Sequence, residues 1–381
     1  MSQTPVREEI RGPSRDELMG RAQALVPALR ERAEHAEELR RLPDETERDF
    51  HNTGLFRMLQ PARWGGSELD YGALIDLGAE VARGCPSSAW NLTNLASHHW
   101  MLAMFPAQAQ SEVWSASPDA LIASSFVFPA GRARRVDGAY LTGGRWPFSS
   151  GVDNSDWNML AALVGGEDEA PPEYRLFLLP KSDYRIIDNW FAAGLRGTGS
   201  KDVEAKDAFV PEHRTLAVDE TKRGAPPGSA VNPGPLYRVA VFAMFPYVLS
   251  GVALGTAQGA FDDFTGAMRS RASRYTGAKL ASLQTVQIRI AESAARIDAA
   301  ALIMRGNCAE AMAFAEAGKT PDIEAKVKYR RDGAYSVRLC VEAVDLLFGA
   351  SGAGALYTNN PIQRAFRDMH AISAHIAFSM E

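Results

Sequence analysis

The sequence predicts an α+β protein, mostly α, in which an N-terminal helical domain, a middle antiparallel β-domain and a C-terminal four-helix bundle follow one another. Three observations predict this order. Apolar residues recur at helical spacing in the first third, short apolar runs separated by Gly and Pro follow, and long Ala-rich helical runs return at the end. We place the domains at residues 1–118, 119–220 and 221–381.

The composition excludes several classes of function. Lys and Arg number 41 and Asp and Glu number 46, so the net charge is −5 and the basic surface of a nucleic-acid-binding protein is not expected. Three widely spaced cysteines, without a C-x-x-C pair, argue against a disulfide framework or a thiolate zinc site and fit a reducing cytoplasm. The polar N-terminal stretch lacks the pattern of a secretory signal.

Four or five helices are expected before residue 120. Ser14 and Glu17 form a capping box that starts the first, and leucines recur on one face of the residues that follow. Pro43 opens a second helix, which ends near Gly54. Apolar spacing then predicts a third helix over 74–82 and a fourth over 87–104, which Pro106 ends.

The middle of the chain changes to the spacing of strands. Apolar runs at 121–128, 157–164, 174–179 and 203–210 are separated by Gly, Pro and acidic loops, and residues 136–139 carry a hairpin signal. These features predict a small antiparallel sheet or barrel between about 120 and 216. The stretch 221–235 is rich in Gly and Pro and is interpreted as a linker.

The last part returns to helices, expected over 284–304, over 325–348 and from 360 to the end. The run 239–261 contains no charged residue and carries Gly251, Gly255 and Gly259 at four-residue spacing. A membrane span and a buried central helix both fit this pattern. We expect the buried helix, because polar residues dilute the run and no second span follows; its glycines would let neighbouring helices approach closely.

The most informative motif lies at 143–151. Trp146 and Phe148 could stack on a planar ligand while Ser149 and Ser150 hydrogen-bond its heteroatoms. The alternative is a strand edge and turn with Trp146 in the core. A second motif, at 195–200, offers two glycines with a Thr and a Ser. It is interpreted either as a phosphate cradle, made by backbone N–H groups and the hydroxyls of Thr198 and Ser200, or as a plain loop.

The histidines do not form a metal site in this interpretation. His98 and His99 are adjacent in the fourth helix and therefore point in different directions, and His370 and His375 are five residues apart, which suits one metal poorly. No zinc spacing and no nucleophile-elbow motif is present, so no metal is expected.

Further motifs carry a family resemblance. Residues 197–203 (GTGSKDV) and 209–214 (FVPEHR) look like a middle-domain signature, and residues 347–352 with 363–368 look like a C-terminal, flavin-contacting signature. With the order of domains and the motif WPFSSG, they resemble the acyl-CoA dehydrogenase fold over almost the whole chain. The resemblance implies that Phe348 and Gly349 contact a flavin.

The stretch 369–378 distinguishes branches within that fold. The dehydrogenases carry a catalytic Glu near this position, whereas this stretch has no carboxylate and contains two histidines. It resembles instead the reduced-flavin-dependent, two-component monooxygenases, which hydroxylate phenols such as 4-hydroxyphenylacetate and phenolic steroid intermediates.

The second resemblance implies roles for single residues. Ser149 would correspond to the hydroxyl beside flavin N5, and Ser124 and His98 to the pair that holds the phenolic oxygen. His375, with His370 as the alternative, would correspond to the C-terminal His near the substrate. The other implied flavin contacts are Trp146, Phe148, Ser150, Thr198, Ser200 and, across a subunit boundary, Arg271 or Arg274.

The implied activity is that of an oxygenase component, which uses reduced flavin (FMNH2 or FADH2) and O2, through a C4a-hydroperoxide, to hydroxylate a small aromatic substrate. It implies a separate NAD(P)H-dependent flavin reductase, a homotetramer and a cytoplasmic location. The alternatives are an acyl-CoA dehydrogenase, an N- or S-oxygenase of the same fold, and a non-catalytic helical scaffold.

Overall fold

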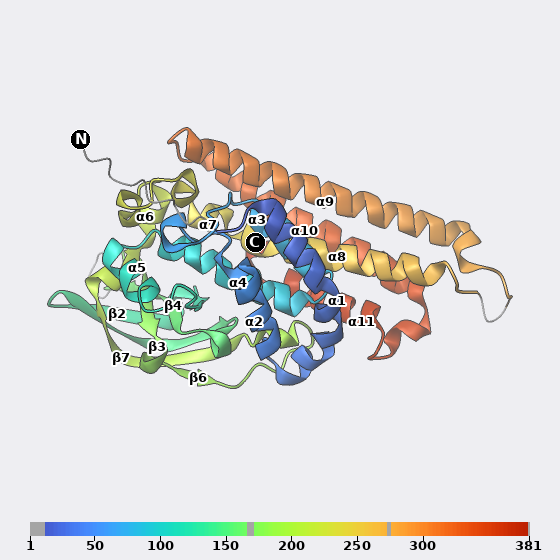
Figure 1. The fold of residues 1–381 in the computed structure, drawn as a ribbon, viewed down its shortest axis with the longest axis horizontal. Helices are drawn as coiled ribbons and strands as arrows, with labels where there is room; N and C mark the ends of the chain where they lie inside the picture. The colour runs from blue at the N-terminus through green and yellow to red at the C-terminus, as the bar shows by residue number, and fades with distance from the viewer. Residues whose placement is uncertain (1–11, 166–170, 273–275, 380–381) are drawn as a thin grey trace, which may run out of the picture.

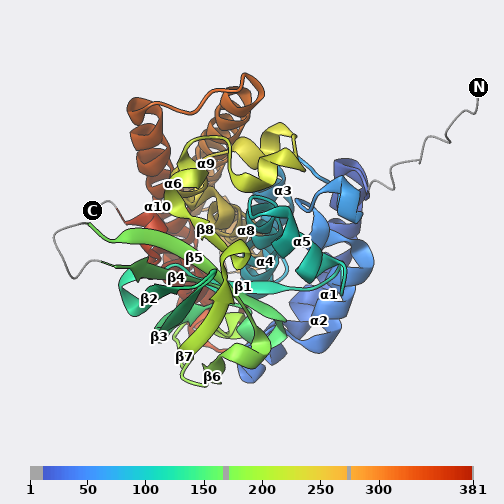
Figure 2. The same ribbon diagram turned by 90° about the vertical axis from the view of Figure 1, so that its left-hand side faces the viewer.

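The computed structural model describes residues 12–165, 171–272 and 276–379. The strands gather at one end of the long axis, the N-terminal helices cover them, and three long C-terminal helices extend side by side toward the other end (Figure 1). Turning the molecule by 90° separates the sheet from the two helical groups (Figure 2). The predicted order of helices, sheet and helices is confirmed; the boundaries at 118 and 220 stay a prediction.

The N-terminal helices begin where the sequence indicates. Ser14 and Glu17 form the expected capping box, and Pro43 is the N-cap residue of the second helix. The helices are α1 (Arg15–Leu39), α2 (Asp44–Thr53), α3 (Ala73–Ala82), α4 (Pro86–Leu102) and α5 (Ala107–Trp114).

The middle of the chain forms one eight-stranded sheet with the order β6-β7-β3-β2-β4-β5-β8, and β1 also pairs with β4. The strands are β1 (Ile122–Ser125), β2 (Gly131–Val136), β3 (Ala139–Ser149), β4 (Trp157–Val164), β5 (Glu173–Pro180), β6 (Arg185–Ile187), β7 (Lys201–Pro211) and β8 (Thr215–Ala217). The predicted hairpin joins β2 to β3, with Gly138 at φ +64° in the turn.

The sheet is not wholly antiparallel, which corrects the expectation. β1 pairs in parallel with the first half of β4, and β2 pairs in parallel with its last two residues. A short 3-10 turn, Phe128–Ala130, separates the two strands, and the chain keeps its direction through it. β1 and β2 therefore run end to end along one edge of β4.

The C-terminal helices are α8 (Pro246–Met268), α9 (Gln284–Glu316), α10 (Ile323–Ser351) and α11 (Pro361–Ser373), which pack against one another. Two shorter helices, α6 (Val218–Lys222) and α7 (Val241–Met244), precede them. The single helix expected over 239–261 is divided between α7 and α8, because Pro246 lacks an N–H and is favoured in the first turn of a new helix.

The glycines of α8 allow α3 to approach closely. A Cβ atom built on Gly255 would lie 1.9 Å from the carbonyl oxygen of Ala79, and one built on Gly251 would lie 2.7 Å from that of Ile75. Side chains at these positions would push the two helices apart. The small-residue spacing of α8 is therefore a helix-packing device.

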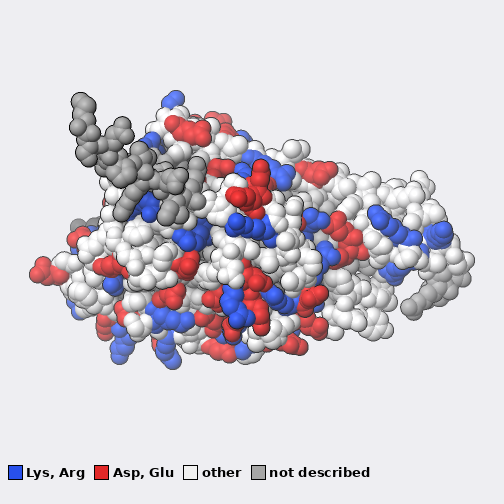
Figure 3. Space-filling view, in the orientation of Figure 1, with Lys and Arg blue, Asp and Glu red and all other residues white. Residues whose placement is uncertain are grey.

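The residues Val241–Met268 are long and apolar enough to cross a membrane by length and composition alone, but 78% of the most apolar window is buried by neighbouring elements. Packing thus explains the apolar composition. Positive and negative side chains alternate over the face drawn in Figure 3, without a large area of one sign.

Candidate active site

One face of α4 carries three of the side chains around which the site is built. Trp90, Asn94 and His98 are four residues apart, so they lie one above the other on the helix. The whole helix is buried. The carboxamide of Asn94 has no hydrogen-bond partner among the described residues, although the residue is only 8% exposed.

His98 is held in one tautomer. Its Nδ1 lies 2.5 Å from the carbonyl oxygen of Ile122, which can only accept, so Nδ1 carries the proton. The Nε2 atom is then an acceptor, and it is buried without a partner. Burial lowers the pKa of His98 to about 4, so the ring is neutral at pH 7 and the Nε2 lone pair is free.

Ser124 lies on β1, two residues beyond the carbonyl that fixes His98. It is buried, and its hydroxyl makes no hydrogen bond to any residue that the structure describes. The neighbouring Ser125, by contrast, donates to the carbonyl oxygen of Pro147 at 2.6 Å. The hydroxyl of Ser124 is therefore available to a ligand.

His375 follows α11 and is a second neutral imidazole. Its Nδ1 accepts a hydrogen bond from the backbone N–H of Ala377 at 3.2 Å, so the proton of the neutral ring is on Nε2. Burial, with a smaller contribution from Arg330, lowers its pKa to about 4. His98 offers an acceptor, whereas His375 offers a donor.

Aromatic rings connect the two histidines. The ring of His98 lies 6.0 Å from that of Phe126, which lies 5.9 Å from Phe245, which in turn lies 6.0 Å from His375 (centroid distances). Trp90 packs edge-on against His375 at 5.5 Å. The structure therefore connects the predicted residues at 98 and 375 through two phenylalanine rings.

The side chains at the end of β3 point in different directions, because the pairing register with β7 shifts between Trp146 and Ser149. Trp146 is completely buried and its indole N–H donates to Ala161 O at 2.6 Å. It is a core residue, which corrects its assignment to flavin stacking. Phe148 has a left-handed backbone (φ +65°) and is 62% exposed.

Ser149 is also enclosed, but it keeps a free hydrogen. Its Oγ accepts a hydrogen bond from the amide nitrogen of Asn158 at 2.9 Å. The hydroxyl hydrogen has no acceptor among the described residues, so Ser149 is a potential donor.

Ser150, Ser200 and Thr198 form a directed chain of hydroxyls. Thr198 donates to the carbonyl oxygen of Leu195 at 2.9 Å, so Ser200 must donate to Thr198 and Ser150 to Ser200, both at 2.7 Å. Trp90 starts the chain by donating to Ser150 at 3.0 Å. Every hydroxyl hydrogen in the chain is committed.

This chain argues against the phosphate cradle. A phosphate needs donors, and the three hydroxyls have none left. The glycines serve packing instead: a Cβ on Gly197 would meet the backbone of Ala36, and one on Gly199 would lie 2.9 Å from a carboxylate oxygen of Asp153. The three hydroxyls therefore offer no donor to a phosphate, and a cradle made by the backbone N–H groups of this loop stays a prediction.

α11 holds this loop in place. Asp368 accepts a hydrogen bond from the backbone N–H of Leu195 at 2.7 Å, and Arg367 donates to the carbonyl oxygen of Ala193 at 2.7 Å. Arg367 also pairs with both carboxylate oxygens of Glu37 on α1. Residues 363–368, which belong to α11, thus link α1 to the loop 195–200.

Asp368 should make the stability of the folded protein fall as the pH rises through neutrality. Burial, opposed by the Leu195 N–H and aided by Glu37, raises its pKa to about 7. Between about pH 4 and pH 7 the folded state then binds a proton that the unfolded chain has lost, so this contribution to stability is full below about pH 4 and is lost as the pH rises through 7.

Asp368→Asn keeps the oxygen that accepts from Leu195 but cannot ionise. We expect its melting temperature to fall less than that of the parent between pH 5 and pH 8, and to exceed the parent value at pH 8. Thermal unfolding across that range measures both. Parallel curves for the two proteins would show that Asp368 is not the titrating group.

The remaining predicted residues form a second group on α10 and α11. Phe348 stacks on Phe366 at 4.3 Å, and His370 pairs with Asp345 at 2.9 Å. His370 is exposed and contacts none of the described residues around His98, which corrects its candidacy for the substrate-side role. Gly349 follows Phe348 on α10.

Arg271 donates to the carbonyl oxygen of Ser351 at 3.1 and 3.2 Å, so its guanidinium lies at the end of α10. Arg274 lies outside the described residues. The suggested contact of Arg271 with a flavin phosphate across a subunit boundary stays a prediction.

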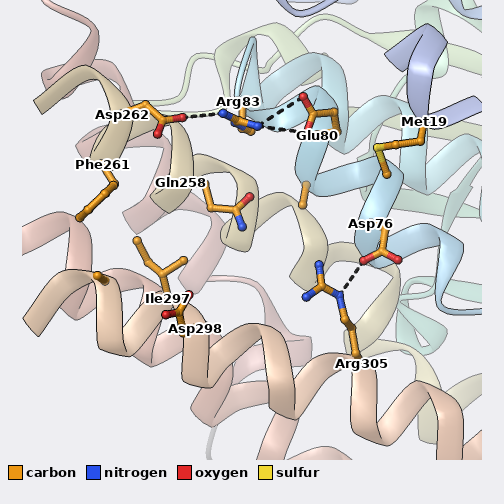
Figure 4. A pocket seen from close by; sticks show the side chains of 12 residues that line it. Met19, Asp76, Glu80, Arg83, Gln258, Phe261, Asp262, Ile297, Asp298 and Arg305 are labelled. Carbon is orange, nitrogen blue, oxygen red and sulfur yellow. Dashed lines mark hydrogen bonds and ion pairs between the residues drawn. The ribbon is translucent and has the colours of Figure 1, made fainter. Parts of the chain in front are cut away.

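A surface cleft of about 580 Å³ lies elsewhere, between α1, α3, α8 and α9 (Figure 4). Most of its charged side chains are paired: Arg83 with Glu80 and Asp262, and Arg305 with Asp76. None of the predicted site residues lines it, so this cleft is not the candidate active site.

Sequence reasoning missed several residues of the site. The spacing of Trp90 and Asn94 from His98 was a usable signal, because it places all three on one helix face. Phe245 and Asn158 gave no such signal, since their places depend on how α7 packs and on the pairing of β4. The role of Asp368 depends on contacts between segments more than 170 residues apart.

The comparisons with known proteins agree with this architecture. Residues 15–117 match the family model "Acyl-CoA dehydrogenase, N-terminal domain", and residues 247–380 match "Acyl-CoA dehydrogenase, C-terminal domain". The crystal structure of 3-HSA hydroxylase from Rhodococcus sp. RHA1 superposes with a TM-score of 0.91, 37% identity, and coverage of 96% of this chain and 94% of that one.

Two relatives identified by sequence indicate to which branch of the fold family the chain belongs. The oxygenase subunit HsaA of a flavin-dependent monooxygenase from Rhodococcus jostii is 38% identical over 94% of each chain. The oxygenase component of an FADH(2)-dependent resorcinol hydroxylase from Rhizobium sp. is 33% identical over 96% of this chain and 91% of its own length. The chain therefore belongs to the acyl-CoA dehydrogenase fold family and, within it, to the oxygenase components of flavin-dependent monooxygenases.

Proposed function

We propose that this oxygenase component hydroxylates a phenol bound between His98, Ser124 and His375. The observation that carries the proposal is the buried, unpartnered Nε2 of His98, which is an acceptor at pH 7. A phenolic O–H is a donor that would satisfy it. An unsatisfied buried polar atom costs stability, and the Nε2 of His98 is an acceptor, whereas the equally unpartnered Nε2 of His99 is a donor and cannot take a phenolic proton.

The two histidines would have different roles in the reaction, because His98 accepts a proton and His375 donates a hydrogen bond. By accepting the phenolic proton, His98 raises electron density at the ring carbon ortho to the oxygen, which is the carbon that takes the new hydroxyl. Ser124 and the Nε2–H of His375 are donors that can hold the oxygen as it gains charge. No carboxylate is among the described contacts of either ring, which disfavours the acyl-CoA dehydrogenase alternative.

The residues at the end of β3 offer contacts to a flavin. Ser149 keeps a free hydroxyl hydrogen, and Phe148 exposes its ring with Trp190 edge-on at 6.5 Å. When bound, reduced flavin supplies the two electrons with which one oxygen atom of O2 enters the ring and the other leaves as water. The aromatic walls exclude water from the reacting atoms.

The proposal extends to the partners that the family resemblance implies. A separate NAD(P)H-dependent reductase supplies reduced flavin, and the chains assemble as a homotetramer of two dimers in the cytoplasm. Three buried free thiols, Cys85, Cys308 and Cys340, support a reducing compartment. Light scattering at micromolar concentration tests the assembly, and a monomer would refute it.

The function is tested by incubating the protein with chemically reduced flavin, O2 and a panel of phenols. We expect a catechol as product, tighter binding of reduced than of oxidised flavin, and no NADH oxidation without an added reductase. Oxidised flavin that is bleached by an acyl-CoA would support the dehydrogenase instead. A protein that binds no flavin in either state would support the helical scaffold.

A further inference from the structure

A second cavity, of about 340 Å³, lies between α1, the turn from α3 to α4, α8 and α11. We call it the α11 cavity. None of the described residues predicted to contact flavin or substrate lines it, so it is separate from the site around His98. The charged residues that line it are Arg30, Glu31, Glu34, Arg83, Asp263 and Arg364.

Two of the three arginines in this cavity have carboxylate partners. Arg30 donates to Asp263 at 3.0 Å. Arg83 donates to Asp262 at 2.7 Å and also pairs with Glu80. The charges of these two guanidinium groups are therefore balanced within the protein.

The guanidinium of Arg364 is not balanced in this way. Its side chain is only 15% exposed, yet none of its N–H groups donates a hydrogen bond to a residue that the structure describes. Its Nε lies 3.4 Å from a carboxylate oxygen of Glu37, but both oxygens of Glu37 already accept from Arg367, at 2.8 and 3.1 Å. Two guanidinium groups thus share one carboxylate, and one positive charge is left over.

Asp368 does not neutralise this charge in mildly acidic solution. Burial raises the pKa of Asp368 to about 7, so its carboxyl group is largely protonated at pH 6. A largely buried cation without hydrogen-bond partners is costly, and an anion placed against it would be stabilising. The planar fork of a guanidinium fits the two oxygens of a carboxylate.

The rest of the cavity limits the charge and the size of such an anion. Glu31 and Glu34 are exposed on α1 and have no ion pair with any residue in the described part of the chain. Their negative charges would repel a dianion more strongly than a monoanion. Ala260 and Ala365 also line the cavity, so there is room beside Arg364 for a short apolar group.

We propose that the α11 cavity binds a small monocarboxylate. Its two oxygens pair with the guanidinium of Arg364, and its short apolar body lies against Ala260 and Ala365. The ligand is held without flavin, and the inference does not depend on the proposed function.

Isothermal titration calorimetry of the full chain at pH 6 and constant ionic strength tests the proposal, with butanoate as the probe. We expect one butanoate per chain, and binding at least about tenfold weaker for butanamide, its neutral analogue, and for the dianion sulfate. Arg364→Gln should raise the Kd for butanoate at least about tenfold, equivalent to about 1.4 kcal/mol. Arg364→Lys, which keeps the charge but loses the fork, should raise it about threefold.

Two control variants locate the binding site. Arg296→Gln removes a partly exposed arginine of α9 outside the cavity, and His98→Ala changes the other site, so both should bind butanoate as the parent does. Glu34→Gln should tighten butanoate binding about two- to threefold, because it removes a repelling charge. A misfolded variant would not gain affinity in this way.

Several results would overturn the proposal. Butanoate binding that persists in Arg364→Gln, or that is lost in His98→Ala, places the carboxylate elsewhere. Tighter binding of sulfate than of butanoate contradicts the monocarboxylate, and a parent protein that binds no butanoate contradicts the site itself. Each of these results leaves the proposed function intact, because hydroxylation of phenols is measured without butanoate.

Discussion

His98→Ala is expected to uncouple oxygen use from hydroxylation. The variant loses the acceptor for the phenolic proton, whereas Ser149 and the aromatic walls beside the flavin are unchanged. O2 should still be consumed, but it should leave as hydrogen peroxide. Because groups that hold or move a proton in catalysis typically contribute about 10²–10⁴-fold, the product formed per O2 should fall by at least about 100-fold. Product analysis beside O2 and peroxide measurements determines the ratio.

His99→Ala is the matched control for packing. It removes an equally buried imidazole from another face of α4, where Nδ1 accepts from the indole N–H of Trp114 at 3.1 Å. Both variants should lose stability, by about 1 kcal/mol or more. Only His98→Ala should lose coupling. If the product-to-O2 ratio stays at the parent value in His98→Ala, His98 is a packing residue and the proposed function loses its main support.

Gly255→Ala is expected to cause the largest loss of stability. The new Cβ atom would lie 1.9 Å from the carbonyl oxygen of Ala79, and a backbone oxygen in a packed helix cannot move aside as a flexible side chain does. α3 and α8 must separate, and we expect the free energy of unfolding to fall by about 3 kcal/mol, at the upper end of overpacking effects. Denaturant unfolding measures it.

Gly266→Ala on the same helix is the control, and it should raise the free energy of unfolding where Gly255→Ala lowers it. A Cβ atom built there meets nothing within 4 Å. Replacing an exposed helical glycine by alanine should stabilise the protein by about 0.5–1 kcal/mol, because alanine has less conformational freedom to lose. If both variants are equally stable, the close approach of α3 to α8 is not a constraint on this helix.

Local sequence signals were sufficient for most of the fold. The capping box at Ser14 and the hairpin at Gly138 depend on residues that are neighbours in sequence, so they could be predicted. The parallel pairing of β1 and β2 with β4 could not be predicted. β4 pairs on one edge with β5, the next strand in the sequence, whereas β1 and β2 come from earlier in the chain and pair with its other edge. Strand pairing between distant segments leaves no periodic trace in either of them.

The candidate site divides in the same way. His98 and His375 were identified by resemblance, and the structure adds their tautomers, which depend on the carbonyl of Ile122 and the N–H of Ala377. Trp146 shows the limit of a motif: its neighbours suggest a stacking platform, but the register shift in β3 turns the ring into the core. Side-chain direction at a bulge follows from the partner strand, not from the motif.

The directed chain from Trp90 through Ser150 and Ser200 to Thr198 has an evolutionary consequence. Each hydroxyl is at once the acceptor of one neighbour and the donor of the next, so losing one member leaves a donor and an acceptor unsatisfied in the interior. Such an orphaned group typically costs about 1–3 kcal/mol. Homologous proteins could therefore substitute these four residues only together, or through an intermediate that tolerates the loss of stability. The four residues should be conserved as a set, although they lie on three separate segments.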